Sequence, residues 1–213
     1  YGQPLDYCRG TSYYGQLIRG FQKLYDFNDL CFTRTNVQSL NGRIEENYSH
    51  YRSWFDEAFQ RAGFQLMFVD QYWKPFNTDL DERYFALVFH INPLVMPVSS
   101  RPSGGDDMPE VYKRALDEGF AIHTLDDYLE YCDHLFKKNV EHHAVCVKNS
   151  LAYSRSLDFE KVSYEVAEAL FRKPSDRLSR QEAKQLQDFI FHWIVEKSAE
   201  YGLPVQIHTG YLA

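Results

Sequence analysis

The sequence lacks any apolar run that could cross a membrane. Its longest such runs, residues 84–89 and 93–98, fall far short of the roughly 20 apolar residues that a spanning helix needs, and no basic-then-apolar leader opens the chain. A basic cluster is also missing, because the 23 Lys and Arg are dispersed among 30 Asp and Glu. We therefore expect a cytoplasmic protein that binds neither membranes nor nucleic acid.

Cysteine is scarce, and its positions show no paired spacing. Cys8, Cys31, Cys132 and Cys146 form no C-x-x-C motif, and a chain of this length does not need disulfides for its stability. We expect reduced and mostly buried thiols. The first residue is Tyr1 rather than methionine, so we also expect the sequence to be a piece of a longer protein.

The overall composition is typical of a globular protein, with 44% hydrophobic and 25% charged residues over 213 positions. Residues 1–63 predict a helical section whose clearest helix runs from 41 to 62. The apolar residues that line one face of this helix are Ile44, Tyr48, Tyr51, Phe55 and Phe59. Gly63 is a typical helix stop, and no catalytic residue stands out in this section.

From residue 64 onward, short apolar segments alternate with helical patterns. The segments that predict buried or half-buried strands are residues 64–69, 84–91, 144–150 and 205–207. A helix is expected over residues 109–118, after the most loop-like stretch of the chain at residues 99–107.

Two further helices have well-marked first residues. Thr124 with Asp127, and Ser179 with Glu182, have the spacing of a capping box. In the second helix, apolar residues follow at intervals of three and four, namely Leu186, Phe189, Ile190, Trp193 and Ile194. Both helices are therefore predicted to bury one face, and the second is predicted to pack on a sheet.

The alternation of strands and helices predicts an α/β fold with a parallel sheet. No G-x-G-x-x-G or G-x-x-x-x-G-K-[ST] motif follows any strand, so the usual phosphate-binding signature of doubly wound nucleotide-binding proteins is missing. A (β/α)8 TIM barrel is favoured, with residues 1–63 as an N-terminal helical section and 64–213 as a partial barrel. Active sites of barrels lie at the carboxyl ends of the strands, where Asp70, His90, Lys148 and His208 fall.

Lys148 lies in a strand whose other residues are mainly apolar or small. A buried ammonium there must be paired, neutral or covalently modified. An amine for Schiff-base chemistry, a carboxylated lysine that bridges two metals, and a partner for a substrate carboxylate all meet this need. A structural lysine that reaches solvent or pairs with an Asp meets it equally well.

His208 follows a short apolar strand and precedes Gly210, which permits close approach of a ligand. A neutral imidazole there is well placed to bind a metal, although a lone histidine is more often a hydrogen-bonded structural residue. The other histidines form no H-x-H or H-E-x-x-H motif, and His90 alone among them falls at a strand end. Tyr153 and Arg155 follow Lys148 on the predicted loop, where a guanidinium can grip a substrate carboxylate or simply be solvated.

Two segments resemble the amidohydrolase superfamily, in particular its amidohydrolase-2 branch of metal-dependent hydrolases with a TIM-barrel fold. Residues 145–157 (VCVKNSLAYSRSL) look like the fourth-strand segment of that family, and residues 203–210 (LPVQIHTG) look like its fifth-strand metal histidine. Asp70 and the segment that begins at His90 are similar to the ends of the second and third strands. The resemblance thus covers residue 64 onward and strands two to five, about half a barrel.

By that resemblance, Lys148 and His208 would be catalytic residues and ligands of one or two divalent ions, with zinc the expected metal. Asp70, His90, Tyr153 and Arg155 would bind the substrate. The first-strand H-x-H pair, the sixth-strand histidine and the eighth-strand aspartate of the family are absent from these 213 residues. The fragment alone is therefore expected to be inactive, and its open sheet edges favour self-association.

The resemblance implies hydrolysis of a C–N or C–O bond in a small, polar, acidic metabolite, with metal-bound water as the nucleophile. Three alternatives stay open at this point. They are a decarboxylase or uronate isomerase on the same metal-binding barrel, a Schiff-base lyase that uses Lys148, and a non-catalytic amidohydrolase-like domain.

Overall fold

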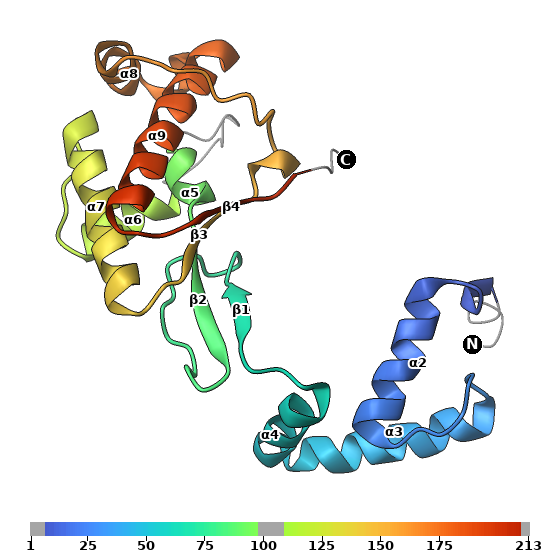
Figure 1. Cartoon of the computed structure of the whole chain (residues 1–213). Helices are drawn as coiled ribbons and strands as arrows, with labels where there is room; N and C mark the ends of the chain where they lie inside the picture. Colours follow the sequence, from blue (N-terminus) through green and yellow to red (C-terminus); the bar gives the residue numbers. More distant parts are fainter. Residues whose placement is uncertain (1–6, 98–108, 210–213) are drawn as a thin grey trace. The chain divides into compact units, whose positions relative to one another are not determined.

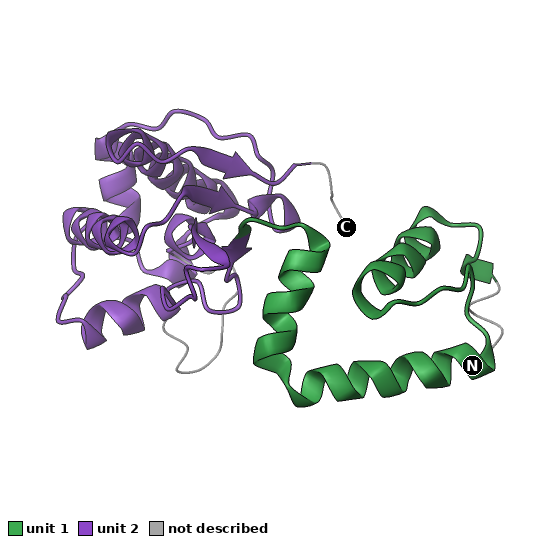
Figure 2. Cartoon of the chain, turned by 60° about the horizontal axis from the view of Figure 1, so that its bottom comes forward, with its two compact units in different colours: residues 1–67 green, residues 68–213 purple. Residues whose placement is uncertain are grey.

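The computed structural model describes residues 7–97 and 109–209. The chain divides into two compact units, residues 1–67 (unit 1) and 68–213 (unit 2) (Figure 2). The boundary predicted from the sequence lies after residue 63, before the first strand. In the structure, unit 1 extends to residue 67, the first residue of that strand. The predicted loop at residues 99–107 lies outside the described ranges.

Unit 1 contains three described helices, α2 (Ser12–Tyr25), α3 (Arg34–Ser49) and α4 (Tyr51–Ala62). Thr11 and Thr33 cap the first two, and Thr33 forms a full capping box with Asn36. Aromatic residues dominate the core of this unit, which consists of Tyr14, Ile18, Tyr25, Phe27, Phe32, Leu40 and Trp54. Burial of these rings is the main term that holds the helices together.

The prediction of a single helix over residues 41–62 is wrong. These residues belong to two helices, because the backbone of His50 (φ −120°, ψ 44°) leaves the helical range between α3 and α4. The predicted apolar face therefore does not continue across the break. Tyr48 and Tyr51 are 62% and 59% exposed, while Trp54 and Phe59 are the buried residues of α4.

Unit 2 is built on a sheet with the order β1-β2-β3-β4 (Figure 1). The strands are β1 (Met67–Asp70), β2 (Phe85–His90), β3 (Cys146–Asn149) and β4 (Val205–Ile207). β3 pairs in parallel with both β2 and β4. Sequential strands thus lie side by side, as in one arc of a barrel.

The first strand differs from its prediction. It starts three residues later than residue 64, and it is not a buried strand, because Phe64 is 53% exposed and Phe68 69% exposed. β1 is at the edge of the sheet, so β2 is its only neighbour among the described strands. An apolar run indicates a strand here, but only the neighbouring elements decide how much of it is buried.

Helices connect β2 to β3 and β3 to β4, and they cover one face of the sheet (Figure 1). They are α5 (Asn92–Val95), α6 (Glu110–Asp117), α7 (Leu125–Glu141), α8 (Tyr164–Phe171) and α9 (Arg180–Glu200), with short 3-10 turns η1 (Leu151–Tyr153) and η2 (Ser175–Arg177). The capping boxes Thr124/Asp127 and Ser179/Glu182 are both confirmed. Local spacing was sufficient to place the starts of α7 and α9.

The core of unit 2 lies between the sheet and these helices. Phe89 and Val147 are completely buried, and Phe89 packs edge-to-face on Phe136 of α7 with 5.1 Å between ring centroids. On α9, Leu186, Ile190 and Ile194 are buried as predicted, whereas Phe189 and Trp193 are only partly buried. Each fully buried Leu or Ile contributes about 1.5–3 kcal/mol relative to an exposed one.

The predicted α/β fold class and the order of strands and helices are confirmed, and the sheet with its outer helices forms part of a (β/α)8 barrel. No described helix is long and apolar enough to cross a membrane. All four cysteines are free, as predicted, but Cys132 alone is buried, so the expectation of mostly buried thiols is wrong.

Candidate active site

Four predicted site residues gather where the strands end. Asp70 and His90 are the last residues of β1 and β2, Lys148 is the last but one of β3, and His208 directly follows β4. The carboxyl ends of parallel strands share one edge of a sheet. We call Asp70, His90, Lys148 and His208 the strand-end row.

The register places the row on one face of the sheet. His90 pairs with Lys148, and Lys148 pairs with Gln206, so their side chains lie on the same side. His208 is two residues beyond Gln206 and therefore also lies on that side. The opposite face carries Phe89 and Val147, which pack against the helices. The row thus faces away from the helical layer, toward what is the interior of a closed barrel.

Asp70 and His90 form the closest pair of the row. Asp70 Oδ1 lies 2.9 Å from His90 Nδ1, with the side chains 27% and 7% exposed. Both atoms are buried, yet neither makes a hydrogen bond within the described part of the chain. The distance defines a close electrostatic contact, but the two atoms are not aligned for a hydrogen bond. The pair is therefore an acid and a base in direct contact at the ends of neighbouring strands.

Lys148 is half-buried beside this pair. Its backbone carbonyl accepts a hydrogen bond from Ile91 N at 3.0 Å, which fixes the ends of β2 and β3 together. Burial raises the pKa of the neighbouring Cys146 thiol, the Lys148 ammonium opposes this change, and the Asp70 carboxylate adds to it. Within the described ranges no carboxylate forms an ion pair with Lys148. The structural Asp partner that the sequence left open is therefore not seen there.

His208 is held by its backbone and covered by a ring. His208 N donates to Asn149 O at 2.8 Å, and the Tyr153 ring lies over the imidazole with 4.6 Å between centroids at 32°. Tyr153 belongs to the turn η1, whose first residue donates Leu151 N to Asn149 Oδ1 at 2.7 Å. The structure thus brings Tyr153 to the row, although it is 60% exposed.

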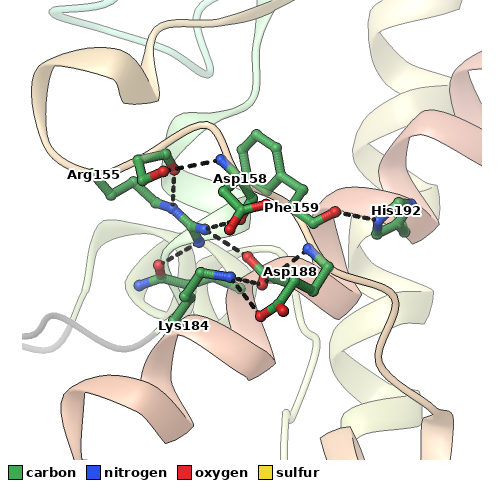
Figure 3. A network of polar contacts seen from close by, with 9 residues as sticks. Arg155, Asp158, Phe159, Lys184, Asp188 and His192 are labelled. Atoms are coloured by element: carbon green, nitrogen blue, oxygen red, sulfur yellow. Dashed lines mark hydrogen bonds and ion pairs between the residues drawn. The ribbon is translucent and has the colours of Figure 1, made fainter.

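The structure does not bring Arg155 to the row. Its guanidinium donates to Asp188 Oδ1 at 2.5 Å and to Gln187 Oε1 at 2.8 Å, both on α9 (Figure 3). It also lies over the Phe159 ring at 4.7 Å. The carboxylate that Arg155 binds thus belongs to the protein itself. A substrate-binding role for Arg155 stays a prediction that these contacts do not support.

Sequence reasoning missed Asp188, Gln187 and Cys146. Asp188 is completely buried although it is charged, and it stands four residues after Lys184, the spacing of a helical ion pair. That spacing was the available signal. Cys146 shares the face of Lys148, two residues away on β3, and could have been recognised from strand alternation.

The described residues do not complete a metal site. No three His, Cys, Asp or Glu side chains come together in residues 7–97 and 109–209 in a way that could hold an ion. The unsatisfied Asp70 and His90 atoms are only two donors, fewer than the three protein ligands of a catalytic zinc site. The zinc site with Lys148 and His208 as ligands stays a prediction, and it needs donors that these residues do not supply.

No family model and no curated protein sequence matches the chain. Solved structures do match it in fold, and two of them are isomerases of uronates. Uronate isomerase from Thermotoga maritima superposes with a TM-score of 0.71 at 12% identity, over 97% of this chain and 45% of that one. Glucuronate isomerase from Caulobacter crescentus gives 0.67 at 16% identity, over 95% of this chain and 42% of that one. The chain therefore spans less than half the length of these neighbours, and at such identities the likeness shows the fold.

Proposed function

We propose that this chain forms part of the active site of a barrel enzyme that isomerises a sugar acid. The observation that carries the proposal is the strand-end row, which gathers acid, base and cation on the inner face of a sheet. That sheet has the fold of two uronate isomerases over nearly the whole chain. The alternative of an isomerase on the barrel, which the sequence left open, thus has more support than hydrolysis.

The row offers what an aldose–ketose isomerisation of a sugar acid requires. A base removes the proton from C2 and an acid returns one to C1, while a proton moves from the C2 hydroxyl to the C1 oxygen, so the reaction needs no external oxidant or reductant. In this proposal the Asp70–His90 pair moves these protons, because an acid and a base are in contact at the carboxyl ends of neighbouring strands.

Lys148 is proposed to hold the carboxylate of the substrate. Its ammonium has no partner carboxylate in the described part of the chain, and it lies next to His90 in the register. A substrate carboxylate would supply the missing countercharge in a partly desolvated place, where such a pair is strong. The same lysine could serve a Schiff-base lyase, but the observed fold neighbours give that chemistry no support.

The test is product analysis with a uronate. The protein that contains this chain is incubated with D-glucuronate, and the products are followed by 13C NMR. We expect the aldose signal at C1 to be replaced by a ketose signal at C2. Release of carbon dioxide would instead support a decarboxylase, and turnover of amides or esters without any ketose would return the hydrolase to first place.

A substitution tests the role of Lys148. Lys148→Met keeps the length of the side chain and removes the charge, so KM for the uronate is expected to rise by about tenfold or more, the effect of losing one charge-assisted contact. Lys161→Met, at an exposed lysine outside the sheet, is the matched control and should leave KM unchanged. An equal KM in both variants would contradict the assignment.

A further inference from the structure

A second polar cluster of unit 2, the Asp188 network, lies on α9. The carboxylate of Asp188 is completely buried, and both of its oxygens are satisfied (Figure 3). Oδ1 accepts from Arg155 at 2.5 Å, and Oδ2 accepts from Lys184 Nζ at 2.5 Å and from Glu160 N at 3.2 Å. Three donors from two separate segments therefore converge on one side chain.

The network fixes the loop that follows β3 to α9. Arg155 also donates to the carbonyl of Ser156 at 2.9 Å, and the ring of Phe159 stacks on Phe191 at 3.7 Å between centroids. Phe159 O contacts His192 Nε2 at 3.2 Å. The loop is thus tied to α9 at Arg155, Phe159 and Glu160.

Tyr153 lies between two fixed points of this loop. On one side, Asn149 Oδ1 holds the first residue of η1. On the other side, Arg155 N donates to Leu151 O at 2.9 Å, and the Arg155 side chain is held by Asp188. Only Ser154 separates Tyr153 from Arg155, so a movement of the arginine would carry Tyr153 with it.

We propose that Asp188 and Arg155 are positioning residues that hold the Tyr153 ring against His208 of the strand-end row. Neither residue contacts the row itself. Asp188 acts through the guanidinium, and the guanidinium acts through the backbone of η1. The carboxylate of Asp188 thus has a role at the site beyond the packing of α9. The kinetic part of the test rests on the proposed function, whereas the spectroscopic part does not.

The decisive variant is Asp188→Asn, which keeps the side-chain size and removes the charge that Arg155 needs. The readout is the chemical shift of the His208 ring protons in histidine-labelled protein without substrate, because an aromatic ring 4.6 Å away shifts them. Tyr153→Leu gives the shift of the uncovered imidazole. We expect Asp188→Asn to move the His208 signals to that value while the circular dichroism stays native.

The control is Glu160→Gln, the same carboxylate-to-amide change within the network. Glu160 pairs with Lys184 on the surface and leaves the Arg155–Asp188 contact intact, so the His208 signals should stay in place. If Asp188→Asn does not fold, the double variant Arg155→Met/Asp188→Leu removes both buried charges together, which proteins often tolerate. It is expected to show the same shift.

Kinetics separate a positioning role from general stability. A displaced Tyr153 should lower kcat for the uronate by up to about 10²-fold, as small misplacements in active sites do. Arg155→Lys, which keeps the positive charge beside Asp188, should lose less of kcat than Arg155→Ala. A folded Asp188→Asn or double variant whose His208 signals match the wild type would overturn the proposal. If the shift moves but no uronate is turned over by the wild type, the proposed function fails and the positioning role stands.

Discussion

The strand-end row and the Asp188 network use the same kinds of residue in the same unit, but they differ in how far their polar atoms are satisfied. In the network, both oxygens of a completely buried carboxylate accept hydrogen bonds from cationic side chains and a backbone amide. In the row, Asp70 Oδ1 and His90 Nδ1 make no hydrogen bond within the described ranges. The Asp188 carboxylate is thus held by hydrogen bonds on both oxygens, whereas Asp70 and His90 hold each other by a close ion pair at the sheet edge.

The largest expected effect is the loss of Arg155. Arg155→Ala leaves Asp188 buried with Lys184 as its remaining cationic partner, so we expect the free energy of unfolding to fall by about 3 kcal/mol, typical of breaking a buried ion pair. Urea unfolding followed by circular dichroism measures it. A loss below about 1 kcal/mol would show that the pair behaves as a surface salt bridge, and the comparison would break.

A smaller effect is expected at the start of α9, the helix that carries the network. The Ser179 side chain accepts from Glu182 N in the capping box, and loss of such a cap costs about 1 kcal/mol. Ser179→Ala should lower stability by this amount, measured by urea unfolding. Ser175→Ala, in the turn η2 and without an N-cap role, serves as the control and should have little effect.

At the row, removal of charge should have almost no effect on folding. Lys148 has no ion-pair partner in the described part of the chain, so Lys148→Met is expected to keep the free energy of unfolding within about 0.5 kcal/mol of the wild type or to raise it. Thermal unfolding beside Arg155→Ala tests this contrast. Destabilisation of both variants by similar amounts would mean that Lys148 is a structural residue after all.

The smallest expected effect is a dependence on pH at the surface. Lys173 and the amide and hydroxyl of Ser179 lower the pKa of Glu182 from 4.5 to about 2. Because the folded pKa lies below the unfolded one, the stabilisation is complete above pH 4.5 and is lost as the pH falls toward 2. The measurement is urea unfolding between these limits, with Glu182→Gln as the comparison. Parallel pH profiles for the two proteins would contradict this origin.

Local signals in the sequence predicted much of the scaffold. The capping boxes of Thr124 and Ser179, and the strands that end near His90 and before His208, were all recognisable, because caps and short apolar runs depend on near neighbours in the chain. The row followed from them, since strand ends in a barrel must meet. The helix break at His50 did not follow, because the apolar spacing of three and four continues through it in the sequence although the face that this spacing predicts is not formed.

Partners distant in sequence were beyond such reasoning. The sequence around Arg155 predicts a substrate carboxylate as its partner. It gives no indication of Asp188, because that residue lies 33 positions away in the chain. Phe68 was expected to be buried, yet it is exposed, since burial depends on which elements cover an edge strand. The metal prediction depended on resemblance, and the described residues offer too few donors to test it.

The most direct test of the contrast between site and scaffold is uronate turnover by Lys148→Met, compared with the wild type and Lys161→Met at a temperature where all three are folded. We predict ketose formation by the wild type and by Lys161→Met, and a strong loss in Lys148→Met despite wild-type stability. Ketose formation at the wild-type rate in Lys148→Met, or none in the wild type, would contradict the assignment of the strand-end row as the active site of a sugar-acid isomerase.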